Sequence, residues 1–173
     1  VVLAGPAMGS FAALLAERLP RGEPVVLTRS RCRGCGRVLR ARDLVPILSW
    51  LWLGGRCAGC GARIPRRLLE AELAGLGLGV AAATLTAEPV ATLLAAGVLW
   101  CLLALALGDL AHMRLPDALT GALVLLAAGL VAAEAEGGGA LWPALGLAAL
   151  GAALGAGAFA LLRAGYRRWA GRE

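Results

Sequence analysis

Two pairs of cysteines, each with the spacing C-x-x-C, lie early in the chain. Cys32 and Cys35 form the first pair, Cys57 and Cys60 form the second, and a glycine directly follows each pair. Four thiolates at this spacing are typical of a tetrahedral structural zinc site. The glycines let each turn point backbone N–H groups at sulfur, and nearby arginines favour the thiolate form. The cysteines therefore predict a structural zinc site.

Disulfide bonds are the alternative role for the same four cysteines. Such bonds are expected in an oxidising compartment and not in a reducing one, so the choice depends on the side of the membrane derived below. A fifth cysteine, Cys101, lies inside an apolar run, where packing is its expected role.

A carboxylate at the end of an apolar run is the second feature that could do chemistry. Asp109 follows residues 90–108, which carry no charge. A charged side chain at membrane depth is costly and usually marks a functional site, whereas an aspartate solvated at a helix end has no such role. Position alone favours neither interpretation. Asp117 is expected to cap the next helix, and His112 and Arg114 are expected to be loop residues or lipid-headgroup contacts.

The composition places these residues in a membrane protein. Of the 173 residues, 60% are hydrophobic and 16% are charged, and the mean hydropathy is +0.77. These values are far from those of a soluble domain. The sequence predicts an all-α, polytopic helical membrane protein with about five spans and a small four-cysteine zinc loop. Flanking arginines can snorkel and so shorten the apolar length that a span needs. The predicted spans are residues 1–16, 73–87 (extended backwards by Leu68 and Leu69), 90–108, 118–133 and 137–162.

The placement of the arginines predicts the orientation of the spans. All 17 basic residues are arginines, and 12 of them lie between Arg18 and Arg67. If that loop is cytoplasmic, every arginine falls inside, while Glu88, Glu134 and Glu136 fall outside, in agreement with the positive-inside rule. The N-terminus is then outside, and the reducing cytoplasm favours zinc over disulfides. Because the charge follows the membrane topology, the sequence predicts no nucleic-acid binding.

The stretch between the cysteine pairs, residues 43–55, is apolar and contains Trp50 and Trp52. It is too short and too broken to cross a bilayer. The tryptophans could lie at the headgroup level of the membrane interface, or they could form the small core of the zinc module. The sequence leaves both interpretations open.

Several further motifs follow one another along the chain. They are Gly9-Ser10-Phe11, Arg18-Leu19-Pro20, Arg29-Ser30 before the first cysteine pair, Asp43-Leu44-x-Pro46-x-x-Ser49-Trp50-Leu51, Gly55-Arg56 before the second pair, Ile64-x-x-Arg67 with Glu72, and Asp109 followed by Pro116-Asp117-x-Leu119-Thr120. In this order they closely resemble the bacterial type IV prepilin leader peptidases. The resemblance covers nearly the whole chain, and it is specific because independent motifs keep their register.

This resemblance implies an activity and a mechanism. Members of the family are membrane aspartyl proteases of the G-x-G-D type, which cut the leader from type IV prepilins and from pseudopilins of type II secretion. Many also methylate the new N-terminal amine with S-adenosylmethionine. By motif position, Asp109 matches the first catalytic aspartate. Two neighbouring carboxylates share a proton, so that one acts as general base on water and the other as acid.

The resemblance also implies how the chain is organised. The second aspartate is expected beyond Glu173, so the chain is expected to be truncated and inactive alone. The expected domains are a first transmembrane helix (1–19), a cytoplasmic zinc loop (20–67) and an incomplete transmembrane peptidase domain (68–173). Prepilin or pseudopilin substrates and membrane lipids are the expected partners, and the bacterial inner membrane is the expected location. The alternative function is a non-catalytic remnant, or a scaffold whose zinc loop docks pilus or secretion assembly proteins.

Overall fold

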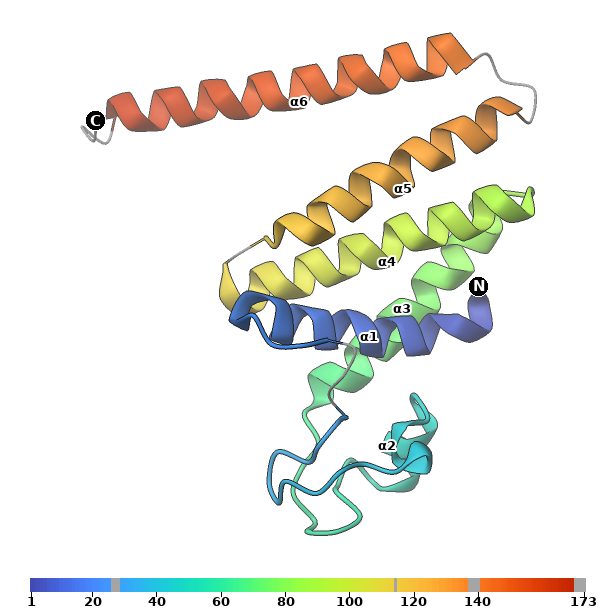
Figure 1. Ribbon diagram of the computed structural model, residues 1–173, viewed down its shortest axis with the longest axis vertical. Coiled ribbons are helices and arrows are strands. Elements are labelled where there is room, and N and C mark those ends of the chain that lie inside the picture. Colours follow the sequence, from blue (N-terminus) through green and yellow to red (C-terminus); the bar gives the residue numbers. More distant parts are fainter. Residues whose placement is uncertain (26–28, 114, 137–140, 170–173) are drawn as a thin grey trace. The chain divides into compact units, whose positions relative to one another are not determined.

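The computed structural model describes residues 1–25, 29–113, 115–136 and 141–169, and the described part is helical (Figure 1). Isolated β-bridges in the cysteine loop are its only extended pairing among these residues. The elements in chain order are η1 (Val2–Ala4), α1 (Gly5–Arg18), η2 (Leu19–Arg21), η3 (Ala41–Leu44), α2 (Leu48–Trp52), α3 (Arg66–Leu85), α4 (Pro89–His112), α5 (Asp117–Glu136) and α6 (Leu141–Trp169).

Within the described residues, five helical stretches are long and apolar enough to cross a membrane, which confirms the predicted all-α, five-span class. They are residues Val2–Arg21, Arg66–Leu85, Pro89–His112, Asp117–Ala135 and Leu145–Leu162. The second begins at Arg66, earlier than predicted, because its arginines lie in the first helical turn rather than before it. Long arginine side chains can reach the headgroups from that position.

The chain forms two compact units, Val1–Leu130 and Val131–Glu173. The first contains the cysteine loop and α1, α3 and α4, which pack pairwise against one another. The second contains the end of α5 and the long helix α6. The domain limits at residues 19 and 67 stay a prediction.

Helices α1 and α3 cross at very close range because glycines meet at the crossing. A β-carbon added at Gly9 would lie 2.0 Å from the carbonyl oxygen of Ala71, and one added at Gly75 would lie 2.3 Å from that of Gly5. Small residues spaced by four let helix backbones approach in this way inside a membrane. Helix α4 closes the contact, since the indole N–H of Trp100 donates to the Gly75 carbonyl at 2.9 Å.

The ends of α4 are set by local chemistry. The Glu88 side chain accepts a hydrogen bond from the Ala91 N–H at 2.7 Å, and Pro89 occupies the first turn, where its missing N–H costs nothing. At the other end Met113 takes the left-handed conformation (φ 53°) and its N–H donates to the Asp109 carbonyl. Cys101 is buried within α4, and its thiol donates to the Leu119 carbonyl of α5 at 3.2 Å, in agreement with a packing role.

Candidate metal centre and membrane carboxylates

The two cysteine pairs form two copies of one turn. In the first, the Gly36 N–H donates to the Cys32 carbonyl at 2.9 Å, and in the second the Gly61 N–H donates to the Cys57 carbonyl at 2.9 Å. Both glycines have left-handed φ values, 70° and 71°. Other residues adopt this conformation at a cost, which explains why a glycine follows each pair.

Backbone amides in both turns point at sulfur, as the sequence predicted. The Gly34 N–H lies 3.3 Å from Cys32 Sγ, and the Gly59 N–H lies 3.4 Å from Cys57 Sγ. Such donors stabilise a thiolate. The turns are therefore built to hold negatively charged sulfur.

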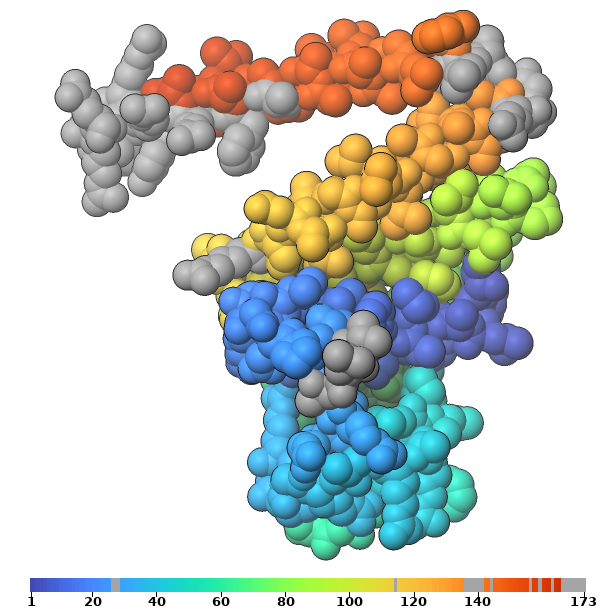
Figure 2. Space-filling model, in the orientation of Figure 1, coloured from blue at the N-terminus to red at the C-terminus, as the bar shows by residue number. Residues whose placement is uncertain are grey.

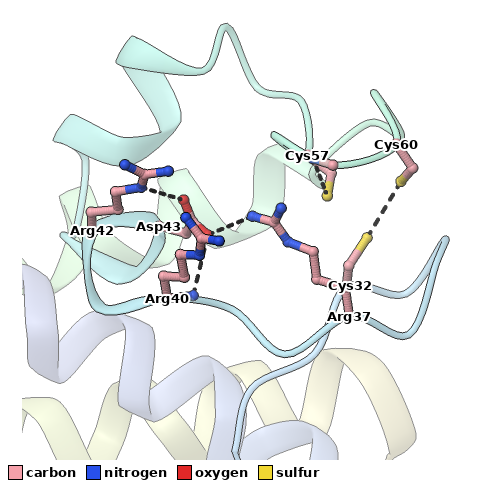
Figure 3. A network of polar contacts seen from close by, with 8 residues as sticks. Cys32, Arg37, Arg40, Arg42, Asp43, Cys57 and Cys60 are labelled. Carbon is pink, nitrogen blue, oxygen red and sulfur yellow. Dashed lines mark hydrogen bonds and ion pairs between the residues drawn. The ribbon is translucent and has the colours of Figure 1, made fainter.

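The four sulfur atoms converge on one point. The Sγ atoms of Cys32, Cys35, Cys57 and Cys60 all lie within 4.8 Å of one another, and the Cys32 and Cys60 sulfurs are 3.8 Å apart (Figure 3). Thiolates bound about 2.3 Å from a tetrahedral zinc ion lie roughly 3.8 Å apart. All five cysteines are free thiols. The cluster can therefore hold a metal ion, and zinc fits its spacing and its four sulfur donors.

The thiols differ in acidity. The backbone N–H groups of Cys35 and Gly34 lower the pKa of Cys32 to about 6. The Ala62 N–H lowers the pKa of Cys60, but the neighbouring Cys35 thiol and burial outweigh it and raise that pKa to about 11. Without a cation the cluster cannot easily lose all its protons, because the thiolates repel one another. A divalent ion would release them, so that metal binding and deprotonation are coupled.

A buried carboxylate braces the metal cluster. The Asp43 side chain is 6% exposed, and its carboxylate accepts from Arg37 Nη2 at 2.8 Å and from the Arg40 N–H at 3.2 Å (Figure 3). The Arg40 N–H, followed by the Arg37 side chain, lowers the pKa of Asp43. The Arg37 guanidinium in turn lies against Gly59, where an added β-carbon would be 3.1 Å from it. Asp43 thus ties the first turn to the second.

Two glutamates connect the loop to the transmembrane helices. Glu17 of α1 pairs with Arg33 of the loop and with Arg67 of α3, the latter at 2.9 Å. Glu72 of α3 accepts a hydrogen bond from the Ile47 N–H at 2.6 Å. Ile47 has φ 62° and ψ −54°, a strained conformation for a β-branched residue. No sequence signal predicts this turn.

Motif residues that are far apart in the sequence line one cavity of about 170 Å³ between the loop and the helices. Ser10 reaches it from α1, and Leu68, Leu69 and Glu72 reach it from α3; the loop supplies the remaining walls. The motifs that carry the family resemblance contribute to its lining at Ser10, Asp43, Leu44, Ser49, Trp50, Cys57, Ile64 and Glu72. Part of the motif residues therefore meet at one place in the structure, which sequence order did not reveal.

The membrane carboxylates lie elsewhere. Asp109 is exposed in the last turn of α4, and Asp117 is exposed in the first turn of α5. A carboxylate at a helix C-terminus faces the negative end of the helix dipole, whereas one at an N-terminus is favoured there. Asp117 therefore stabilises the N-terminus of α5, whereas Asp109 does not stabilise the C-terminus of α4. His112 ends α4 with a buried Nε2 that has no partner among the described residues; Arg114 lies outside them.

Residues 3–86 match the family described as the bacterial peptidase A24 N-terminal domain. Proteins named prepilin leader peptidase/N-methyltransferase are similar to the chain. The one from Aeromonas hydrophila is 38% identical over 62% of the chain and 36% of its own length, and the one from Dichelobacter nodosus is 41% identical over 63% and 37%. That from Myxococcus xanthus is 42% identical over 30% of the chain and 16% of its own length.

The chain spans about a third of the length of the Aeromonas relatives. No solved structure matches it significantly. The family match and the relatives together confirm the resemblance predicted from the motifs.

Proposed function

We propose that this chain is part of a membrane aspartyl endopeptidase, because residues 3–86 match the family described as the bacterial peptidase A24 N-terminal domain. Its substrates are prepilins or pseudopilins, whose leader peptides it removes. The observation that carries the proposal is the family match, which covers the cysteine loop, α1 and α3 together. The names of the relatives support the same activity.

Asp109 is the proposed catalytic carboxylate of this chain. Its position in the last turn of α4 gives the helix no stabilisation, and a carboxylate retained at membrane depth usually serves a function. Paired with a second carboxylate, it would share one proton: one group takes a proton from water as the water attacks the scissile carbonyl, and the other donates to that carbonyl. The second aspartate is expected in a G-x-G-D motif.

Mutation of the two aspartates tests this assignment. Asp109→Asn keeps the size of the side chain but removes its ionisation, so leader cleavage should fall by orders of magnitude. Asp117→Asn is the matched control, and it should retain substantial activity. The assay follows cleavage of a membrane-embedded prepilin by the product of the complete reading frame, at equal expression. Cleavage at the unmutated rate by Asp109→Asn would refute its catalytic role.

The cysteine loop is proposed to lie on the cytoplasmic side of the bacterial inner membrane. The arginine asymmetry supports this orientation. Reporter fusions at Gly34 and at Glu88 should give opposite signals, cytoplasmic for the first and external for the second. The same signal at both positions would contradict the topology.

The bound metal is proposed to be a structural zinc ion held by the four thiolates of the loop. The spacing of the sulfurs and the amides that face them support this choice. Four protein ligands leave no open position for a substrate, so the ion stabilises the fold of the loop and takes no part in cleavage. The loop in turn forms most of the cavity wall.

N-methylation with S-adenosylmethionine as donor belongs to the same proposal and is supported by the printed name of the relatives. The two carboxylates of the cavity, Asp43 and Glu72, already accept hydrogen bonds from the protein. The described residues contain no glycine-rich strand–turn–helix unit. We therefore assign no residue to the donor. Transfer of a labelled methyl group to cleaved pilin tests the activity, and cleavage without transfer would contradict it.

A further inference from the structure

The short helix α2 and the residues before it expose a cluster of large apolar side chains. Leu48 is 62% exposed, Leu51 59% and Trp52 88%, and Leu44 and Val45 are also exposed. Figure 2 shows this segment, in cyan, on the outer surface of the loop. Trp50 points the other way and lines the cavity. The two tryptophans therefore have different roles: Trp50 belongs to the core of the loop, and Trp52 does not.

This apolar cluster is tied to the first turns of α3. Ile47, which directly precedes α2, is hydrogen-bonded to Glu72. Glu72 follows Arg66 and Arg67, the first two residues of α3, by about 8 Å along the helix axis. Glu72 is the last charged residue of α3, and residues 73–85 after it carry no charge. The Glu72 contact therefore holds α2 where the charged start of the helix meets its apolar part.

A contact with helix α1 independently places the α2 region at a similar distance from the arginine end of that helix. Ser10 lines the cavity together with Ser49 and Trp50 of the α2 region. Ser10 lies about 12 Å along α1 from Arg18 at its polar end. Both transmembrane helices thus meet the α2 region inside their own arginine ends.

The exposed charged residues that flank the cluster in the sequence are all basic. Arg40 and Arg42 precede it and Arg56 follows it, and all three are exposed. The one acid in residues 40–56, Asp43, is buried against Arg37. Exposed apolar side chains flanked by arginines match a bilayer surface that carries anionic lipids.

We propose that residues 44–52 form an interfacial anchor, which inserts Leu48, Leu51 and Trp52 at the headgroup boundary of an anionic membrane. The anchor fixes the zinc loop against the bilayer, and the flanking arginines hold the lipid phosphates. Without the anchor, these apolar side chains would face water although a membrane surface that could cover them lies close by. Anchoring also limits the movement of the cavity wall, since Ser49 and Trp50 belong to the same segment.

Depth-dependent fluorescence quenching of the full chain in nanodiscs tests the proposal. The Trp52 signal is the difference between the unmutated protein and Trp52→Phe. Bromine placed near the headgroup end of the acyl chains should quench this signal strongly, and bromine near the methyl end should quench it weakly. Trp50→Phe is the matched control, and the signal that it removes should show little quenching by either lipid.

A second experiment varies the charge of the lipid and the residues of the apolar cluster. Arg42→Gln should lower the equilibrium constant between the docked and the undocked segment by about fivefold, and replacing anionic lipid by zwitterionic lipid should lower it further. Leu48→Ser with Leu51→Ser should expose Trp52 to a water-soluble quencher while zinc content is unchanged. Absence of lipid quenching of Trp52 would overturn the proposal. The proposal would also be overturned if Leu48→Ser with Leu51→Ser weakened substrate binding but left the quenching of Trp52 by brominated lipid unchanged. The cluster would then bind protein rather than lipid.

Discussion

The glycine crossing of α1 and α3 makes a quantitative prediction for Gly75→Ala. The added β-carbon would lie 2.3 Å from the Gly5 carbonyl oxygen and 2.6 Å from the Gly9 nitrogen. Both atoms are backbone, so no side chain can rotate to make room. An ordinary contact needs at least 3.4 Å. The helices must therefore move apart by about 1 Å, and the close packing between them is lost.

The size of the effect follows from a matched substitution on the same helix. Gly77→Ala meets no atom within 4 Å, so it changes only the intrinsic helix propensity, which favours alanine by about 1 kcal/mol in water. Gly75→Ala carries the same propensity change together with overpacking, which costs roughly 1–3 kcal/mol. The difference between the two variants isolates the steric cost. It should be about 1–3 kcal/mol in the free energy of unfolding.

Reversible unfolding in mixed detergent micelles, followed by circular dichroism, measures this difference. Gly77→Ala should be as stable as the unmutated chain or slightly more stable. Gly75→Ala should be less stable, and hydrogen exchange should rise at the crossing. Equal stability of the two alanine variants would refute the close backbone contact.

Three further predictions concern the loop. The purified protein should bind about one zinc ion, and chelation should expose the loop arginines to trypsin while the transmembrane helices keep their helicity; unchanged proteolysis would contradict a structural metal. Asp43 has a pKa lowered below its ordinary value of 3.8, so its contribution to stability is complete above pH 3.8 and disappears as the pH falls through the lower folded-state pKa. Asp43→Asn should abolish this acid-dependent loss of loop protection, and an unchanged pH profile would show that another group causes it. Glu72→Ala should leave the Ile47 N–H without its acceptor, at a cost of roughly 1–3 kcal/mol. Glu72→Gln should cost less because it retains an acceptor oxygen, and equal hydrogen exchange at Ile47 in both variants would argue against the bond.

Some features follow from the sequence by itself because their causes are local. A span depends on about 20 consecutive apolar residues, so the five membrane helices could be recognised before any contact was known. The cysteine cluster is similar: each C-x-x-C turn closes within a few residues, and the glycine that follows each pair, Gly36 or Gly61, takes the left-handed conformation that closes the turn. The catalytic role of Asp109 depends on a partner carboxylate and stays a prediction.

Tertiary structure decided the features that depend on contacts between distant residues. The sequence left Trp50 and Trp52 with the same two alternatives, and the fold separates them because positions two residues apart on a helix face different sides. The roles of Asp43 and Glu72 required the positions of Arg37 and Ile47, which local periodicity does not specify. The same holds for Gly9 and Gly75: each is an ordinary helix glycine in the sequence, and only the crossing of α1 and α3 leaves no room for a β-carbon.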